Sequence, residues 1–430
     1  MKDRITLGQG LLALSPIAVF LLVYLVSSIV AGDFYKVPVS SAFLIACIYA
    51  VTVSKGPVSD RIHTFSTGAG HTKILLMVWI FILAGVFAGT AKDIGSIDAT
   101  VNATLSIIPP RALYAGLFLT ACFISMSIGT SVGTVVALVP IASGIAAHCE
   151  LSAPFLSAVV VGGAFFGDNL SFISDTTIAA TRAVGCEMGD KFKVNILITA
   201  PAVIIVTLIY VFMGQGVNAS APVGDMQMVK ILPYIMVIVL ALAGQNVFAI
   251  LTLGIVMNAA IGFCCHDYDF VGWLVSAGNG ISGMSDLIVI SLLAGGLMNT
   301  IRENGGLDFV IDRLTRRIKG KRGAELSIAG LVCMANLCTA NNTIAIITVG
   351  DISKEISEKF GLDMRKTASI LDTFSCFIQG IVPYGIQLLM AAGLASCSPV
   401  EILPFLYYPF IMGLCALLSI LLRYPRKYSA

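Results

Sequence analysis

Apolar runs long enough to cross a lipid bilayer recur along the whole chain, and they restrict its fold more than any other feature. Examples are GLLALSPIAVFLLVYLVSSIV (10–30), KILLMVWIFILAGVFAG (73–89) and ILITAPAVIIVTLIYVFMG (196–214). Each is close to the roughly 20 residues that span a bilayer as an α-helix. Only 12% of the 430 residues are charged. The runs do not alternate between apolar and polar residues, as the strands of a membrane β-barrel would. Because backbone polar groups in lipid must form hydrogen bonds within the protein, we predict an all-α polytopic membrane protein.

The sequence also repeats itself. LAGVFAGTAKDIGSID (83–98) aligns with LAGGLMNTIRENGGLD (293–308) at an offset of 210 residues, and six of the sixteen positions are identical. The same offset places SIGTSVGT (127–134) over LCTANNTI (337–344). We therefore predict a first repeat over residues 1–215 and a second over residues 216–430.

The basic residues indicate how the two repeats are oriented. If all twelve apolar segments crossed the membrane, the basic loop 300–326 would lie outside whenever the N-terminus lies inside, against the positive-inside rule. If segments 112–146 and 326–350 are instead re-entrant helical hairpins, only Lys36, Lys92, Arg111 and Lys230 of the 26 Lys and Arg residues lie outside. Each repeat then has five transmembrane crossings plus one hairpin. The repeats are therefore expected to be inverted, with both termini cytoplasmic.

Four interruptions in this pattern mark the expected binding site. They are the two hairpin tips and the breaks in the discontinuous helices 154–184 and 367–395, and in inverted-repeat transporters such breaks meet near the bilayer midplane. The hydroxyl, amide and carbonyl oxygen atoms at the tips suit a small cation such as Na⁺, whereas the helix N-terminus that begins at each tip suits a carboxylate. The sequence therefore leaves open whether the tips bind a cation or a carboxylate. The tip residues are Thr130, Ser131 and Thr134 in the first repeat and Thr339, Asn341, Asn342 and Thr343 in the second.

Acidic residues inside apolar segments are the strongest candidates for ion binding. GGAFFGDNLSFISDTT (162–177) contains Asp168 and Asp175, and Asp372 lies in the paired segment of the second repeat. A charge at the membrane centre costs ~2.5 kcal/mol or more, so such residues are expected to be ion or proton sites. Desolvation favours the protonated carboxyl and a bound cation favours the ionised one, so one site holds H⁺ or Na⁺ in turn. Asp175, which precedes TTIAAT, is either an ion ligand or a helix N-cap.

Arg182 is the only basic residue that the sequence places well within a span. It either extends to the interface or contacts a substrate carboxylate. Gln379, in the break QGIVPYG, is a second candidate for contact with a substrate anion. The sequence has no HExxH or GxSxG motif, and we expect no enzyme activity.

Several segments resemble a known family. FGDNLSFISDTTIAATRAVGCEMGDKFKVN (166–195) is similar to the FGD and SDTT segment of the NhaC sodium/proton antiporter family, and GTSVGTVVALVPIA (129–142) resembles its first hairpin. The resemblance extends over essentially the whole chain and implies the inverted-repeat fold. It implies cation or proton roles for Asp168, Ser171, Ser174, Asp175, Thr176 and Thr177, together with the first hairpin tip. Asn169 is a further candidate for ion binding, but it departs from the family pattern, which commonly has His at this position.

We therefore predict a secondary active transporter of the bacterial inner membrane that exchanges Na⁺ for H⁺. Na⁺ is expected at Asp168 and Asp175 as the transported ion, and no cofactor is expected. The alternative is a Na⁺- or H⁺-coupled transporter of a small organic acid or amino acid. The expected partners are the lipid bilayer, Na⁺ and H⁺, with an organic anion and a homodimer left open and no nucleic acid.

Overall fold

The computed structural model describes residues 6–31, 37–107, 109–171, 174–217, 227–243, 245–315 and 318–429. Within these ranges the chain is helical and forms no strand. The helices of the first half are α1 (Leu7–Ala31), α2 (Val39–Val53), α3 (Val58–Ala69), α4 (Thr72–Asp93), α5 (Ser96–Ile107), η1 (Pro110–Ala112), α6 (Leu113–Ile128), α7 (Ser131–His148), α8 (Ala153–Leu170), α9 (Asp175–Val184) and α10 (Met188–Gly214).

The second half has a similar succession of helices. They are η2 (Met228–Ile231), α11 (Leu232–Leu242), α12 (Val247–Cys265), α13 (Phe270–Gly283), α14 (Ser285–Glu303), α15 (Gly306–Thr315), α16 (Gly320–Thr339), α17 (Asn342–Phe360), α18 (Met364–Ile381), α19 (Ile386–Leu394), α20 (Pro399–Ile402), η3 (Leu403–Phe405), α21 (Tyr407–Leu421) and η4 (Arg426–Tyr428). Among the described residues, 8 helices are long and apolar enough to cross a membrane, or up to 10 if each of two bent pairs is one span. The predicted all-α membrane fold is confirmed.

Three helices, α3, α5 and α13, were not predicted. The sequence of α13, FVGWLVSAGNGISG, is rich in Gly and Ser, which are poor helix formers. Its small residues allow a close approach to α4, because a Cβ atom on Gly280 would lie 2.2 Å from the carbonyl oxygen of Gly85. Close packing between helices therefore outweighs the weak helix propensity of this segment.

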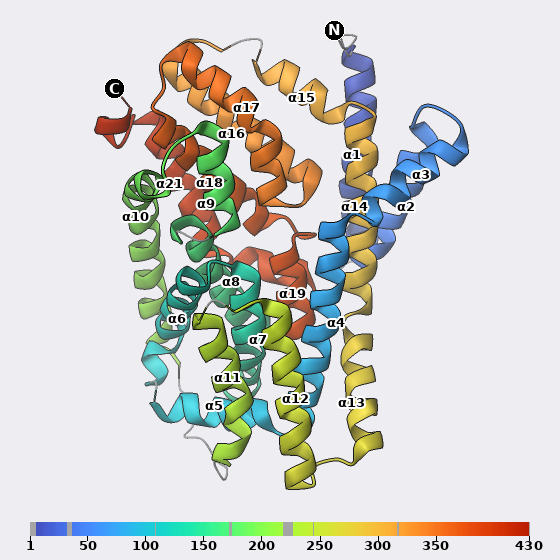
Figure 1. Ribbon diagram of the computed structural model, residues 1–430, viewed down its shortest axis with the longest axis vertical. Helices are drawn as coiled ribbons and strands as arrows, with labels where there is room; N and C mark the ends of the chain where they lie inside the picture. Colours follow the sequence, from blue (N-terminus) through green and yellow to red (C-terminus); the bar gives the residue numbers. More distant parts are fainter. Residues whose placement is uncertain are drawn as a thin grey trace.

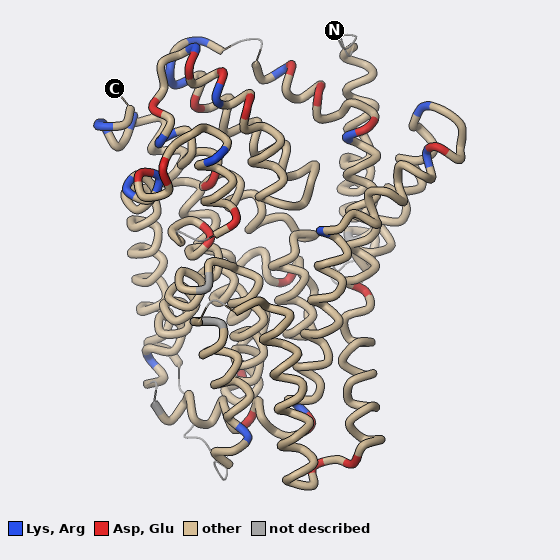
Figure 2. Tube along the Cα trace, viewed as in Figure 1, with Lys and Arg blue, Asp and Glu red and all other residues tan. Residues whose placement is uncertain are grey.

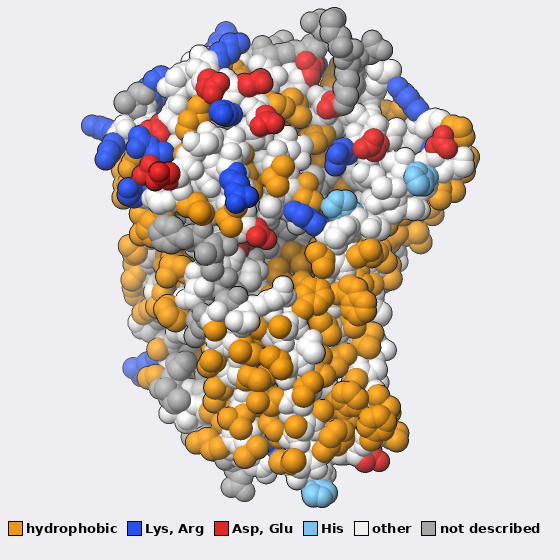
Figure 3. Space-filling view, viewed as in Figure 1, with side chains coloured by type: hydrophobic (Ala, Val, Ile, Leu, Met, Phe, Trp, Pro, Cys, Tyr) orange, Lys and Arg blue, Asp and Glu red, His pale blue; other side chains and the backbone are white. Residues whose placement is uncertain are grey.

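Charged residues are distributed unequally between the two ends of the molecule. The N- and C-termini lie at the same end (Figure 1), and most Lys and Arg residues gather there (Figure 2). Hydrophobic side chains cover most of the remaining face in Figure 3. Helices α5 and α15 follow the long helices α4 and α14 and lie at opposite ends of the molecule (Figure 1).

The helix breaks recur at constant spacing in the two halves. The α6–α7 turn contains Gly129 and the α16–α17 turn contains Ala340, both with left-handed backbone. Helix α8 ends at the C-cap Ser171 and α18 ends at the C-cap Val382. The same number of residues separates the members of both pairs, and this number is close to the offset of the sequence repeat. The division into two repeats, their inversion and the re-entry of their hairpins stay predictions.

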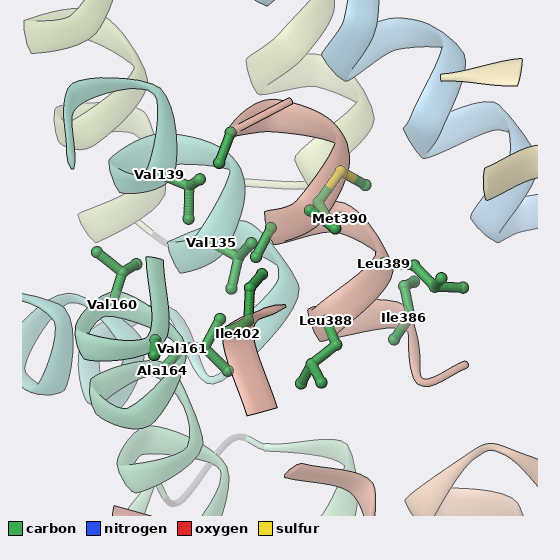
Figure 4. Close-up of a cluster of buried hydrophobic side chains, with 14 of the residues drawn as sticks. Val135, Val139, Val160, Val161, Ala164, Ile386, Leu388, Leu389, Met390 and Ile402 are labelled. Atoms are coloured by element: carbon green, nitrogen blue, oxygen red, sulfur yellow. The ribbon is translucent and has the colours of Figure 1, made fainter. Parts of the chain in front are cut away.

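The breaks are held together by a shared hydrophobic core. Figure 4 shows side chains of α7, α8 and α19 gathered in one cluster, including Val135, Val161 and Leu388. All three are buried. Interiors packed in this way have few voids and resist rearrangement. The cluster therefore fixes the start of α7, the end of α8 and the start of α19 relative to one another.

Candidate functional site

The first site residue, Asp168, lies in the last turn of α8 and is 5% exposed. Ser131, the first residue of α7, donates its backbone N–H to Oδ1 at 3.0 Å and its hydroxyl to Oδ2 at 2.6 Å. The free N–H groups and the dipole of a helix N-terminus both favour an anion there. Within the described part of the chain no Lys, Arg or His forms an ion pair with Asp168. Its negative charge is therefore stabilised by dipoles and lacks a protein cation.

The break between α8 and α9 folds back onto the backbone of Asp168. The hydroxyls of Ser174 and Thr176 donate to the Asp168 carbonyl at 2.8 and 2.9 Å. Ser174 also accepts the backbone N–H of Thr177 at 3.2 Å. Ser174, and not Asp175, is therefore the N-cap of α9. The side chain of Asp175 is exposed at the first position of that helix.

A buried ion pair lies behind this break. Lys191 of α10 and Asp372 of α18 have side chains 1% and 0% exposed, and their N–O distance is 2.8 Å. The ammonium of Lys191 also donates to the carbonyl of Asn169 and the hydroxyl of Thr177, both at 2.7 Å. One turn along α10, Asn195 donates to Asp372 Oδ2 at 2.8 Å. These contacts tie α8, α9, α10 and α18 together and compensate the charge of Asp372.

The first-half site is linked to the second half by two glutamines. The side chain of Gln387, in α19, donates to the hydroxyl of Ser131 at 2.9 Å. Gln379, in α18, donates to Gln387 at 3.1 Å and to the carbonyl of Ala340 at 3.3 Å. Since Ala340 lies in the α16–α17 turn, an unbroken hydrogen-bond chain runs from Asp168 to the second hairpin tip. The structure thus brings Gln379 into the network as a neutral connector.

The second hairpin tip is largely occupied by local hydrogen bonds. Asn341 caps α17 by accepting the N–H of Ile344 at 2.9 Å, and the hydroxyl of Thr339 donates to the Asn341 carbonyl at 3.1 Å. Asn342 accepts the N–H of Thr343 at 3.0 Å. Thr134, in the first tip, donates to the Thr130 carbonyl at 3.3 Å, as threonines in membrane helices commonly do.

A polar cavity of about 260 Å³ separates the two tips. Its wall on the α4 side includes Lys73 and Met77. An adjoining hollow of about 400 Å³ shares both residues and adds His71 and Arg302. The predicted site residues that line the smaller cavity are Thr130, Ser131, Asp168, Asp175, Thr176, Asn341, Asn342 and Thr343, joined by Gln387. The other predicted site residues, Thr134, Asn169, Ser171, Ser174, Thr177, Arg182, Thr339, Asp372 and Gln379, do not line it.

The structure places Arg182 in the last turn of α9, with an exposed side chain. Two basic residues that the sequence analysis did not single out, Lys191 and Lys366, are each 1% exposed in the first turns of α10 and α18. Lys366 donates to the carbonyls of Ser419 and Tyr424 and anchors the C-terminal segment. The spacing of Lys191 and Asn195, four residues apart on one helix face, is the sequence signal that could have revealed the buried pair.

A buried acid at a helix break, facing a polar cavity inside a bundle of apolar spans, defines a secondary active transporter. The chain belongs to the Na⁺/H⁺ antiporter family, whose sequence profile matches residues 6–215 and 219–425. The resemblance noted in the sequence is thereby confirmed.

Similar proteins extend over most of the chain. The Na⁺/H⁺ antiporter NhaC of Alkalihalophilus pseudofirmus is 23% identical and covers 99% of this chain and 96% of its own length. NhaC of Bacillus subtilis is also 23% identical, over 81% of this chain and 83% of its own length. The malate-2H⁺/Na⁺-lactate antiporter of B. subtilis is 22% identical, over 81% of this chain and 80% of its own length. The similarity therefore involves both halves.

Proposed function

We propose that the protein exchanges Na⁺ for H⁺ across the bacterial inner membrane, with both termini in the cytoplasm. The observation that carries this proposal is the buried carboxylate of Asp168, which lines the cavity and receives hydrogen bonds from Ser131. An uncompensated charge inside a bilayer is costly. Asp168 is therefore stable in an occluded state only when it holds H⁺ or Na⁺. Because the two ions exclude one another at one carboxylate, their movements are coupled.

The cavity supplies the remaining ligands for Na⁺. Asp175 and Thr176 line the same space as Asp168, and so do Thr130 and Ser131 of the first hairpin tip. Hydroxyl, carbonyl and carboxylate oxygens are the hard ligands that such a cation prefers. In this proposal Asp168 and Asp175 bind Na⁺, the hydroxyls complete its coordination, and exchange requires no cofactor. The cavity's place between the hairpin tips supports the inverted-repeat arrangement that transporters of this kind use.

Reconstituted protein tests the proposal directly. In proteoliposomes that contain a trapped pH dye, an external Na⁺ pulse should drive proton movement without any organic substrate. Asp168→Asn should abolish that signal and leave the protein extractable and monodisperse. The matched control is Asp98→Asn, because Asp98 lies in α5 and pairs with His148 away from the ion cavity. If Asp168→Asn exchanges at the parental rate, the central assignment is wrong.

Lys73 favours a second candidate function, coupled transport of a small organic acid. Its side chain lines both the ion cavity and the adjoining hollow, so a carboxylate could bind Lys73 while a cation binds Asp168. The sequence indicated Arg182, and not Lys73, as the positive partner for such an anion. Two results together would favour this function over simple exchange. The proteoliposomes should take up a radiolabelled organic acid only when Na⁺ is present, and Na⁺ should drive no proton movement when the organic acid is left out.

A further inference from the structure

The ammonium of Lys191 occupies an environment that resembles a cation site. It contacts three oxygen atoms, from the Asn169 carbonyl, the Thr177 hydroxyl and the Asp372 carboxylate, at 2.7, 2.7 and 2.8 Å. These oxygens come from the end of α8, from α9 and from α18. Lys191 therefore acts as a cation that is covalently attached to the chain and cannot leave.

Among the described residues, the charges around the break leave one buried carboxylate without a cation partner. Asp372 and Lys191 compensate one another inside the protein. Asp168 is buried as well, but its hydrogen bonds come from the neutral groups of Ser131. The third acid near the break, Asp175, is exposed. Burial of an unpaired charge is far more costly than burial of a pair, so the buried cluster requires one additional positive charge.

We propose that Lys191 is the permanent counter-ion of Asp372, so that Asp168 is the buried carboxylate at this break that exchanges its bound cation, and each cycle exchanges one Na⁺ for one H⁺. This inference rests on the proposed Na⁺/H⁺ exchange and adds its stoichiometry. The proton leaves a carboxyl oxygen of Asp168 for water on one side, and Na⁺ takes its place on the same carboxylate. The buried cluster of Asp168, Asp372 and Lys191 has the same net charge when it carries H⁺ across the membrane as when it carries Na⁺ back. Exchange is therefore electroneutral.

Removal of the ammonium should create a second exchanging acid. Without Lys191, Asp372 keeps the hydrogen bond from Asn195 but loses its only cation partner in the described part of the chain. The amide oxygen of Asn195 is buried and has no hydrogen-bond donor among the described residues. A second proton can then bind Asp372 on the crossing that carries H⁺, while the crossing that carries Na⁺ still holds a single ion at Asp168. The variant would then move two protons in one direction against one Na⁺ in the other, a net transfer of one positive charge per cycle.

Measurement of the flux reversal point tests the stoichiometry. Proteoliposomes are given opposing Na⁺ and H⁺ gradients, and valinomycin with K⁺ sets the membrane potential. For the unaltered protein we expect flux to vanish when the Na⁺ and H⁺ ratios are equal, at any potential. An exchanger that moves one net charge would instead shift its reversal Na⁺ ratio about tenfold for each ~59 mV of potential. A potential-dependent reversal point for the unaltered protein overturns the proposal, whatever the variants do.

The variants separate a role in charge compensation from a purely structural one. Lys191→Met should make the reversal point depend on potential, and the double variant Lys191→Met/Asp372→Asn should restore independence because both members of the pair are then neutral. Lys191→Arg should behave as the parent. An active Lys191→Met protein with a potential-independent reversal point contradicts the assignment. If no Na⁺-driven proton movement is detected at all, the proposed exchange function is refuted. Failure of the exchange function can therefore be distinguished from failure of the stoichiometry.

Discussion

Asp168 and Ser131 are joined through both oxygens of the carboxylate, one bonded to the backbone N–H and the other to the hydroxyl of the same serine. Asp168 lies in the last turn of α8 and Ser131 begins α7, so an ion at this carboxylate contacts the breaks of two helices at once. The same hydroxyl accepts a hydrogen bond from Gln387 of the second half. The hydrogen bonds at this carboxylate therefore connect the two halves of the molecule, and we expect an ion bound there to alter contacts in both.

Loss of the Ser131 hydroxyl should weaken Na⁺ binding. The hydroxyl lies 2.6 Å from Asp168 Oδ2, so an ion held by that carboxylate also meets Ser131. A hydrogen bond to a charged group is worth about 1.5–3 kcal/mol, and Ser131→Ala should raise the Na⁺ concentration for half-maximal exchange roughly tenfold or more. Ser127→Ala is the control, because the Ser127 hydroxyl donates to the Phe123 carbonyl within α6. An unchanged Na⁺ requirement in Ser131→Ala would exclude the hydroxyl from the site.

Asp175 and Ser174 should respond differently to substitution. Asp175 faces the cavity, and its charge attracts Na⁺, so Asp175→Asn should raise the half-maximal Na⁺ concentration by roughly fivefold, or about 1 kcal/mol. Ser174 caps α9 and bonds to the Asp168 carbonyl, so Ser174→Ala should lower the free energy of unfolding by about 2 kcal/mol. Chemical unfolding in detergent measures this loss. A larger stability loss in Asp175→Asn than in Ser174→Ala would reverse these roles.

The site residues that are unusual in their local sequence were found from the sequence alone, and those whose role depends on the packing of distant helices were missed. Asp168 and Ser131 stand out because a carboxylate and a Gly/Ser/Thr-rich turn are unusual inside apolar runs. Lys191 follows the polar stretch CEMGD (186–190), which resembles a connecting loop. Only the packing of α9 and α18 against α10 buries its ammonium, and no short sequence window contains both Lys191 and Asp372.

Gln387 and Lys73 were missed for related reasons. Gln387 is the second residue of the short apolar helix IQLLMAAGL, where a single amide resembles a tolerated polar residue in a span. Lys73 stands at the N-terminal edge of an apolar run, where a basic residue is the usual end of a membrane helix. In both cases the residue type was visible, but the direction of the side chain toward a shared cavity depends on the arrangement of distant helices.

Neutralisation of Lys73 should strengthen Na⁺ binding. Lys73 lines the cavity together with Asp168 and Asp175, so its positive charge opposes the entry of a cation. Lys73→Gln should lower the half-maximal Na⁺ concentration about two- to fivefold, equivalent to roughly 0.5–1 kcal/mol, and the difference should shrink at high ionic strength. Arg182→Gln, which changes an exposed residue outside the cavity wall, should leave it unchanged. Weaker Na⁺ binding in Lys73→Gln would contradict this electrostatic account.

Addition of one methyl group at Gly167 should disturb the ion site through packing alone. Gly167 directly precedes Asp168 and packs against α6, and a Cβ atom there would lie 2.3 Å from the backbone carbonyl carbon of Ser125. Rotation of a side chain cannot relieve a backbone clash, and such overpacking costs about 1–3 kcal/mol. Gly167→Ala should therefore lower both the thermal unfolding midpoint and the exchange rate. Gly189→Ala, at a helix position with open space around it, should lower neither, and a Gly167→Ala protein with parental stability would show that α6 and α8 can separate at little cost.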